Sequence, residues 1–368
     1  MILRKVKWEK INDELVGKRI VVFGAGTNYK YCIEPAFIED VKNSIVYAID
    51  NNPSLNQINI NGALLNVYRV EKLKDESNCS VLLCGIDHML EMYEQLETME
   101  LPDSIECYAL PLSLSEYCGD EDIELKGIAF DEKCLQRIPK CIHTFWFSGD
   151  EIPENYAKCI DSWKKYCPDY EIKIWNSKTY DINGSEFVEN AIQARKWAFA
   201  SDYARLDVLN KHGGIYMDMD VELCGTMDLL LGNRAFFTFE SGNEIEPAIM
   251  GTEKSYPVLQ YMLNVYKDMK FQDSDEAFKE YCMPHLIRKP LENFGVKMDG
   301  TMQIIDGAVF LPRKYFSPMD NVVYETLVQT DETIGVHLMN GSWKDGGSME
   351  RKRKNNRKLR DIVAEKAM

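Results

Sequence analysis

The stretch AFASDYARLDVLNKHGGIYMDMDVEL, residues 198–223, decides the fold of the C-terminal half of the chain. Its pattern predicts a helix over about residues 193–211, and the pair Gly213-Gly214 is expected to end that helix. The apolar residues 215–217 then predict a short strand. A helix followed directly by a short apolar strand is typical of an α/β fold, so we expect this class here.

Two acidic residues, Asp218 and Asp220, follow that strand. Side chains two apart on a strand point to the same side, so we expect both carboxylates to converge at the strand end. Two such charges repel each other, and Mg²⁺ or Mn²⁺, which prefers carboxylate, phosphate and water oxygens, would compensate them. Short acidic pairs also arise by chance in solvated loops, but this pair follows a hydrophobic strand. The residues therefore predict a metal site able to hold a diphosphate.

The predicted helix carries Asp202 and Arg205, which are three residues apart and hence share one face. Side chains of this kind are suited to bind the hydroxyl groups of a sugar. The alternative is an ion pair on a solvated helix surface, worth less than about 0.5 kcal/mol. The spacing alone leaves both interpretations open.

A strand-helix-strand unit is predicted upstream, in IPKCIHTFWFSGDEIPENYAKCIDSWKKYCPDYEIKIWN, residues 138–176. Its strands are expected over residues 141–147 and 170–175. Ligands of open α/β sheets bind beyond the carboxyl ends of the strands, and Trp146 falls at such an end. Trp146 is therefore either a platform for a flat nucleobase or a core residue that fills space.

The N-terminal region begins with KRIVVFGAGTNY, residues 18–29, where an apolar strand leads into Gly24-x-Gly26. Further strands are predicted over residues 44–49 and 80–84, and a helix over residues 89–99. This alternation predicts a small Rossmann-like, doubly wound domain over residues 1–115. Asp50 lies at the distance beyond the glycines that is typical of dinucleotide-binding domains, but Tyr29 occupies the third glycine position. Nucleotide binding and a structural or docking role both stay open.

The composition is that of a globular protein, with 368 residues, 45% of them hydrophobic and 28% charged, which is long enough for two domains. The 43 basic and 59 acidic residues give a net charge of −16, which argues against nucleic-acid binding. The 11 cysteines are scattered without a C-x-x-C pair, which favours reduced thiols over disulfides or structural zinc. Neither a membrane span nor a signal peptide is predicted, so we expect a cytoplasmic protein.

The predicted domains are joined by an acidic linker over residues 116–137, and the second domain, residues 138–348, is followed by a basic tail, residues 349–368. The tail contains RKRKNNRKLR. Each basic side chain near an anionic bilayer contributes about 1 kcal/mol, so this tail predicts peripheral contact with the inner face of the plasma membrane. Arg351–Lys354 would make the contact, and Leu359 would enter the lipid interface. The alternative is a solvated helix that aids solubility.

Three segments, taken in order, resemble the retaining glycosyltransferases of family 32, whose sugar-binding region contains the DXD motif. The segments are IPKCIHTFWF with SWKKYCPDYEIKIWN, then SDYARLDVLNKHGGIYMDMD, and finally VHLMNGSW, all within about residues 138–345. The family includes transferases of capsular-polysaccharide biosynthesis. The resemblance implies a GT-A fold, a Rossmann-like α/β sandwich, for the second domain.

The resemblance also implies a role for each matching residue. Trp146 would stack on the nucleobase, and Asp202 and Arg205 would contact the donor sugar. Asp218 would contact the ribose and the sugar, or the metal through water. Asp220 would ligate the metal, Mn²⁺ or Mg²⁺, directly.

Near the C-terminus, the resemblance implies that His337 contacts the metal or the diphosphate. A lone histidine is more often structural, but this one precedes an Asn-Gly turn. Ser342 and Trp343 follow, and they would close as a lid, hydrogen-bond the β-phosphate and exclude water.

These patterns together predict a metal-dependent retaining glycosyltransferase that moves a hexose from a nucleotide sugar, a UDP-hexose in the first instance, to a saccharide acceptor. The acceptor could be lipid-linked, as in capsular polysaccharide biosynthesis. One alternative is a nicotinamide-dependent sugar oxidoreductase or epimerase that acts through Gly24, Gly26 and Asp50. Another is a non-catalytic module that binds sugar nucleotides.

Overall fold

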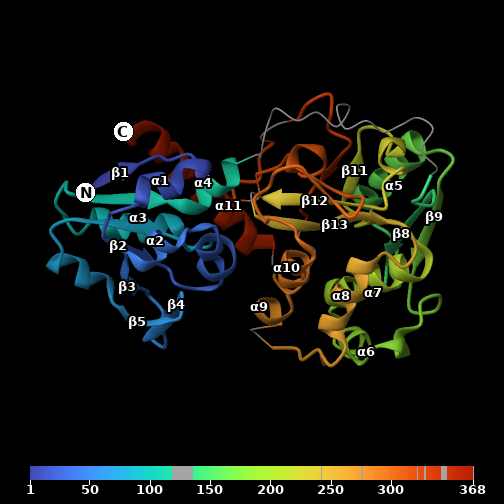
Figure 1. Cartoon of the computed structure of the whole chain (residues 1–368), viewed down its shortest axis with the longest axis horizontal. Coiled ribbons are helices and arrows are strands. Elements are labelled where there is room, and N and C mark those ends of the chain that lie inside the picture. Colours follow the sequence, from blue (N-terminus) through green and yellow to red (C-terminus); the bar gives the residue numbers. More distant parts are fainter. Residues whose placement is uncertain are drawn as a thin grey trace. The chain divides into compact units, whose positions relative to one another are not determined.

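The structure, a computed structural model, describes residues 1–117, 136–241, 243–274, 277–320, 322–326, 329–340 and 346–367 (Figure 1). The chain divides into two compact units, which are described separately. The first unit consists of Met1–Tyr117, Asp320–Glu325 and Lys344–Met368. The second unit consists of Cys118–Met319 and Thr326–Trp343. Most of the expected linker, residues 118–135, lies outside the described residues.

The first unit is built on a sheet with the strand order β1-β7-β6-β2-β3-β5-β4. Its strands are β1 (Ile2–Arg4), β2 (Ile20–Phe23), β3 (Ile45–Ile49), β4 (Gln57–Ile60), β5 (Ala63–Tyr68), β6 (Cys79–Leu83) and β7 (Ile105–Ala109). The strands pair in parallel except for the hairpin of β4 and β5. Every residue of β2 and of β6 is buried, because helices of a doubly wound sheet cover both faces of its central strands. The expected Rossmann-like sheet is confirmed.

The helices of the first unit are mostly short. They are α1 (Ile11–Leu15), α2 (Glu39–Asn43), α3 (Met89–Glu97), α4 (Leu110–Glu116) and α11 (Gly346–Lys366), with a π-helix at Tyr29–Ile33 and 3-10 helices at Trp8–Lys10, Glu34–Ala36 and Val70–Asp75. Tyr29, at the third position of the glycine fingerprint, is buried.

The basic C-terminal segment differs from the separate tail that its composition predicts, because it forms helix α11 and packs against α3 of the first unit. Leu359 is fully buried in the same apolar cluster as Val363, so it does not enter a lipid interface as expected. Ion pairs join Lys358 to Glu94 at 2.7 Å and Lys366 to Glu97 at 2.9 Å. The amphipathic helix thus uses its apolar stripe and part of its charge within the unit.

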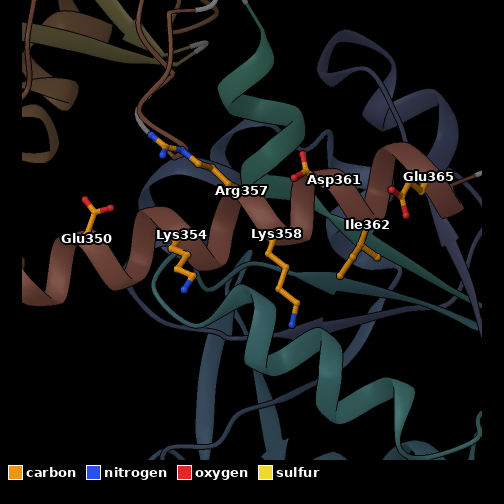
Figure 2. Close-up of a pocket in the computed structure, with 7 residues that line it drawn as sticks. All are labelled: Glu350, Lys354, Arg357, Lys358, Asp361, Ile362 and Glu365. Carbon is orange, nitrogen blue, oxygen red and sulfur yellow. The ribbon is translucent and has the colours of Figure 1, made fainter.

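A hollow of about 440 Å³ lies along α11 (Figure 2). It is lined by Glu350, Lys354, Arg357, Lys358, Asp361, Ile362 and Glu365. Three acidic and three basic side chains line this hollow, so it does not present charge of one sign. None of the described helices combines the length and the apolar character needed to span a lipid bilayer.

The second unit contains a mixed sheet with the strand order β14-β15-β12-β13-β10-β8-β9 and a small sheet of β11 and β16. The strands are β8 (Cys141–Phe145), β9 (Glu171–Trp175), β10 (Gly214–Met217), β11 (Val221–Leu223), β12 (Ala235–Ser241), β13 (Glu244–Thr252), β14 (Gln303–Ile305), β15 (Ala308–Leu311) and β16 (Gly335–His337). Strands β9, β8 and β10 are parallel, whereas β13 runs antiparallel to β10. The expected α/β class is confirmed for this unit as well.

The helices of the second unit include α7, which holds the helical part of residues 198–223. They are α5 (Glu154–Tyr166), α6 (Glu186–Gln193), α7 (Trp197–His212), α8 (Pro257–Tyr266), α9 (Ala277–Tyr281) and α10 (Met283–Phe294), with 3-10 helices at Ile182–Gly184, Asp228–Leu230 and Arg313–Tyr315. The helix expected from residue 193 begins instead at Trp197, because Arg195 has a φ of +57° and separates α6 from α7. A left-handed residue of this kind ends a helical run.

The pair Gly213-Gly214 ends α7 as expected, and the structure shows why both positions are glycine. Their φ values are +67° and +105°, which disfavour any other residue. A Cβ atom on Gly213 would lie 2.8 Å from the nitrogen of Lys254, and one on Gly214 would lie 2.7 Å from the oxygen of Cys141. The chain therefore passes tightly from α7 into β10, between its sheet neighbours.

Candidate functional site

The acidic pair lies at the carboxyl end of β10, but not on the strand itself. Strand β10 ends at Met217, and Asp218 begins a turn that is closed by a hydrogen bond from the nitrogen of Val221 to its oxygen, at 3.1 Å. The expectation that strand alternation brings Asp218 and Asp220 together is therefore wrong. The turn brings the two carboxylates together instead, because it folds the chain back into β11.

The small sheet brings His337 to the same place. Val221 of β11 pairs with His337 of β16. Asp220 is held on this side by two backbone contacts: its carboxylate accepts a hydrogen bond from the nitrogen of Asn340 at 2.9 Å, and its carbonyl accepts one from the nitrogen of Leu338, also at 2.9 Å. One ligand atom from each of Asp218, Asp220 and His337 lies within 4.8 Å of the others.

These three side chains offer two carboxylate oxygens and one imidazole nitrogen, a ligand set that suits Mn²⁺ and is acceptable to Mg²⁺. Burial raises the pKa of Asp218, although the nearby Arg205 guanidinium opposes this effect. Burial would also raise the pKa of Asp220. The charge of His337 and the hydrogen bonds that the Asp220 carboxylate accepts outweigh burial, so the pKa of that carboxyl is lowered. The acidic pair thus includes one carboxyl that favours its charged form.

Asp202 and Arg205 form a buried pair, so the solvated helix surface considered above is excluded. Their side chains are 14% and 4% exposed, and the guanidinium Nη2 lies 2.8 Å from a carboxylate oxygen of Asp202. The same nitrogen lies 3.6 Å from Asp218, and Nη1 donates a hydrogen bond to the oxygen of Pro247 at 2.7 Å. Burial raises the pKa of Asp202 to about 7, although Arg205 opposes that shift. The structure therefore places this pair directly beside the acidic turn.

Trp146 follows β8, which is the parallel neighbour of β10, so it lies at the same end of the sheet as Asp218. Its indole nitrogen donates a hydrogen bond to the oxygen of Asp150 at 2.7 Å. The ring meets Tyr156 edge-on, with 5.7 Å between the ring centroids, and it is half-buried. The predicted nucleobase platform is therefore partly accessible, whereas Ser342 and Trp343 of the predicted lid lie outside the described residues.

Two further residues belong to this site, and the sequence analysis did not identify them. The hydroxyl of Tyr216, in β10, donates a hydrogen bond to the carboxylate of Asp218, and the Arg205 guanidinium lies 4.5 Å from the centroid of its ring. Glu246, in β13, contacts His337. The sequence offered no local signal for either residue, because Glu246 shares β13 with a second acid, Glu244, and Tyr216 is one aromatic residue in an apolar strand.

The glycine turn of the first unit has a different arrangement. The carboxylate of Asp50 accepts hydrogen bonds from the nitrogen of Ala25 at 3.1 Å and from the nitrogen of Asn52 at 2.8 Å. A Cβ atom on Gly24 would lie 3.0 Å from the Cε atom of Met92, a buried residue of α3. Asp50 thus ties backbone loops together, and an apolar side chain fills the space beside the first glycine.

Two carboxylates and an imidazole at the end of a mixed α/β sheet, next to a buried Asp-Arg pair, define a candidate cation site of a group-transfer enzyme. Residues 153–237 match the family described as "Glycosyltransferase sugar-binding region containing DXD motif". This segment contains Asp202, Arg205, Asp218 and Asp220. The prediction of a glycosyltransferase domain with a DXD motif is confirmed at this level.

Known proteins similar to this chain include inositol phosphoceramide mannosyltransferase 3 of Schizosaccharomyces pombe, which is 32% identical over 33% of this chain and 35% of its own length. Mannosyl phosphorylinositol ceramide synthase SUR1 of Saccharomyces cerevisiae is 24% identical over 49% of each chain. The chain thus spans between a third and a half of these relatives. Among solved structures, the PaToxG glycosyltransferase is 20% identical, with a TM-score of 0.36, over 42% of this chain and 68% of its own.

Proposed function

We propose that this protein is a metal-dependent retaining glycosyltransferase with a GT-A fold in its second unit. It would transfer a hexose from a nucleoside diphosphate sugar, a UDP-hexose in the first instance, to a saccharide acceptor. The observation that carries the proposal is the convergence of His337 at the end of β10 with Asp218 and Asp220, which belong to the matched sugar-binding segment. The mannosyltransferase names of the relatives support a hexose as the transferred group.

Each residue of the site has a place in this reaction. Asp218, Asp220 and His337 would hold Mn²⁺ or Mg²⁺, which when bound supplies positive charge at the diphosphate of the donor. Asp202 and Arg205 would orient the hydroxyl groups of the donor sugar. Because Arg205 is fixed by Pro247, Ser201 and Asp202, its position requires no rearrangement when the sugar binds.

The transfer itself replaces one bond to the anomeric carbon by another. The acceptor hydroxyl oxygen bonds to that carbon, while its bond to the diphosphate oxygen breaks and the nucleoside diphosphate departs. The acceptor proton passes to the departing phosphate oxygen. Attack on the face that the diphosphate leaves gives retention of configuration and requires no protein nucleophile. Trp146 would meanwhile stack on the base, and Ser342 and Trp343 would exclude water.

Donor turnover tests the proposal. The purified chain should be incubated with UDP-glucose, UDP-galactose and GDP-mannose, each with Mn²⁺, and release of the nucleoside diphosphate should be measured. We expect Mn²⁺-dependent hydrolysis of one donor, and EDTA should abolish it. Hydrolysis of GDP-mannose alone would contradict the UDP-hexose assignment but not the enzyme class.

The same panel separates the alternatives. Tight binding of a sugar nucleotide without hydrolysis, and without transfer to any saccharide acceptor, would indicate a non-catalytic binding module. Reduction of NAD by a UDP-sugar would instead indicate the oxidoreductase. The backbone contacts of Asp50 and the position of Met92 beside Gly24 argue against the second outcome.

We also propose that the acceptor can be lipid-linked, as in capsular polysaccharide biosynthesis, and that the protein acts in the cytoplasm with peripheral contact to the inner face of the membrane. The lipid-directed names of the relatives support a lipid-linked acceptor. Lys352 pairs with Asp87 at 2.6 Å, so the exposed Arg351 and Lys354 would make the membrane contact. Sedimentation with anionic vesicles at low salt should detect it, and an R351E/K354E variant should remain in the supernatant. Equal sedimentation of both proteins would contradict this contact.

A further inference from the structure

Glu246 lies behind the candidate cation site, in strand β13, and it is only 1% exposed. Its Oε2 atom lies 2.8 Å from Nδ1 of His337 and accepts a hydrogen bond from the hydroxyl of Ser317 at 3.0 Å. Its Oε1 atom accepts a hydrogen bond from the nitrogen of Ala248, also at 3.0 Å. A buried carboxylate is costly unless it is fully paired, so these contacts explain how the fold tolerates it.

We propose that Glu246 is a positioning residue for the cation site: it fixes the ring of His337, keeps a proton on Nδ1 and so directs Nε2 toward the ion. The proposal rests on the proposed function, because it assumes that His337 is a ligand. The Nε2 atom already faces the acidic turn, at 3.5 Å from a carboxylate oxygen of Asp220.

The hydrogen-bond pattern determines which ring nitrogen carries the proton. A carboxylate can only accept, and the Ser317 hydroxyl already donates to the same oxygen, so Nδ1 of His337 must be a donor. When a metal ion takes the place of the second ring proton, the ring is neutral and has its lone pair on Nε2, which is the form that ligates a metal. Carboxylates in this outer position fix both the tautomer and the orientation of the ring, and their loss costs about 10- to 100-fold in metal affinity.

The strand around Glu246 also holds the other parts of the site. The nitrogen of Asp218 donates a hydrogen bond to the oxygen of Ala248 at 2.8 Å, and Nη1 of Arg205 donates to the oxygen of Pro247. The segment from Glu246 to Ala248 thus contacts the histidine, the first acid of the turn and the buried arginine. A displacement of this segment would move all three, so it acts as one support for the site.

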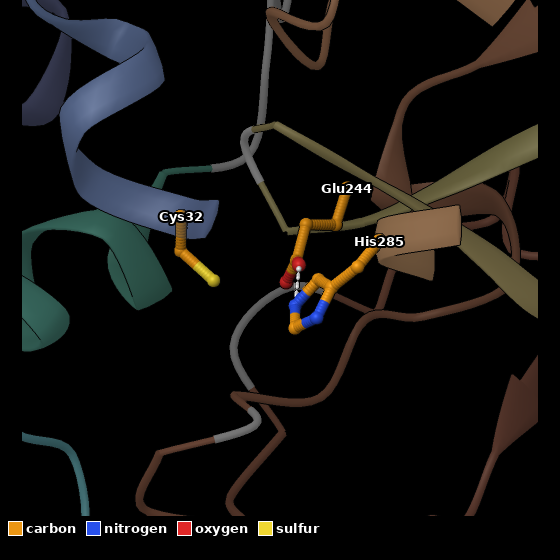
Figure 3. Close-up of side chains that lie close together, drawn as sticks. All are labelled: Cys32, Glu244 and His285. Carbon is orange, nitrogen blue, oxygen red and sulfur yellow. Dashed lines mark ion pairs between the residues drawn. The ribbon is translucent and has the colours of Figure 1, made fainter. Parts of the chain in front are cut away.

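The same strand provides a matched control two residues away. Glu244 also pairs with a histidine, with 3.2 Å between its carboxylate and Nε2 of His285 (Figure 3). His285 is not a member of the cluster of Asp218, Asp220 and His337. A Glu244→Gln substitution therefore makes the same chemical change in β13 at a Glu-His pair outside the candidate site.

The decisive variant is Glu246→Gln, which keeps the size of the side chain and inverts part of its hydrogen bonding. If the amide NH₂ faces His337, it donates to Nδ1 and the ring proton moves to Nε2, where it blocks a metal. If the amide oxygen faces His337 instead, the NH₂ group opposes the nitrogen of Ala248 and leaves a buried donor unpaired. Neither orientation preserves the present arrangement.

Binding of Mn²⁺ alone to the full chain, followed by the electron paramagnetic resonance signal of free Mn²⁺, tests this inference. We expect Glu246→Gln to weaken Mn²⁺ binding by about 10- to 100-fold and Glu244→Gln to leave it unchanged. Retained Mn²⁺ affinity in Glu246→Gln, with loss in His337→Ala, would overturn the role of Glu246 but not the proposed function. Absence of Mn²⁺ binding by the wild type would contradict the metal site itself and this inference with it.

A second measurement does not depend on whether the Glu246→Gln variant folds. In ¹⁵N spectra of histidine-labelled wild-type protein saturated with Mg²⁺, the five histidines can be assigned by substituting each in turn, and Nδ1 of His337 should carry a proton while Nε2 does not. A wild-type spectrum in which Nδ1 is unprotonated near neutral pH would overturn the proposal.

Ser317→Ala, which removes one donor to Glu246 and keeps the carboxylate, should weaken Mn²⁺ binding by less than Glu246→Gln does.

Discussion

Each of the two units carries a motif directly after a buried parallel strand: glycines with Asp50 in the first unit and an acidic pair in the second. The side chains of the two motifs make different contacts. In the first unit, the carboxylate of Asp50 accepts hydrogen bonds from the nitrogens of Ala25 and Asn52. In the second unit, Asp218 and Asp220 converge with His337, and a ligand atom of each lies within 4.8 Å of the others. Asp50 thus holds backbone loops together, whereas Asp218 and Asp220 form part of a candidate cation site.

The difference lies in what surrounds each motif. The acidic turn of the second unit brings like charges together, an arrangement that a bound cation would stabilise. Beside Gly24 in the first unit, the apolar side chain of Met92 occupies the space near the turn. A motif at a strand end therefore indicates where a ligand can bind in an α/β sheet, and the side chains packed around the motif determine whether one does.

The largest expected effect is at Asp220. Asp220→Asn should lower metal-dependent donor hydrolysis by at least about 100-fold, since it removes a charge that would face the cation. The free energy of unfolding should change little, because the amide oxygen can still accept the hydrogen bond from Asn340. Hydrolysis rates at saturating Mn²⁺ measure the first quantity and urea unfolding the second. Retained Mn²⁺-dependent turnover would contradict the metal assignment.

Arg205 should affect both activity and stability. Arg205→Ala leaves the buried Asp202 without its partner, so the free energy of unfolding should fall by about 3 kcal/mol. Arg205→Lys keeps the charge but loses the forked geometry, and it should impair hydrolysis of the donor sugar more than binding of the nucleoside diphosphate. Calorimetric binding of UDP and GDP, compared with the hydrolysis rate, separates these effects. An equal loss of nucleotide affinity and turnover would contradict a contact to the sugar.

The pKa of Asp202, raised to about 7, predicts a pH dependence of stability that the Asp202→Asn variant lacks. Between about pH 4 and 7, the folded protein holds a proton that the unfolded chain has released, so this residue makes stability fall as pH rises. The slope is about 1.4 kcal/mol per pH unit at most, and it vanishes above pH 7. Urea unfolding of both proteins at pH 5, 6 and 7 tests this. A constant difference between them across that range would contradict the shifted pKa.

The smallest effect is expected in the first unit. Asp50→Asn keeps one hydrogen-bond acceptor and weakens one backbone contact, so it should lower the free energy of unfolding by about 1 kcal/mol without changing donor hydrolysis. NAD should not bind the wild-type chain at low micromolar concentration. Urea unfolding and calorimetry measure the two quantities. A saturating NAD titration that Asp50→Asn abolishes would show that this motif is also a ligand site.

Local sequence patterns predicted the elements well where burial is uniform. Strands β2 and β6 are buried at every position, so each appears in the sequence as a continuous apolar run, whichever face of the sheet a residue occupies. The glycine pair before β10 correctly predicted the end of α7, because its backbone conformation disfavours other residues. The start of α7 was missed, since the left-handed Arg195 that ends the preceding run has no distinctive side chain.

The sequence by itself determined the α/β class and the acidic pair, because strand and turn propensities act between residues that are near one another in the chain. The family resemblance already implied that His337 contacts the metal, but only the tertiary structure decided that Glu246 lies behind it, that Arg205 is buried and that Leu359 lies in a core. These features depend on which distant strands and helices pack together. Such pairing is set by the sum of many weak contacts across a whole core, so no short segment encodes it.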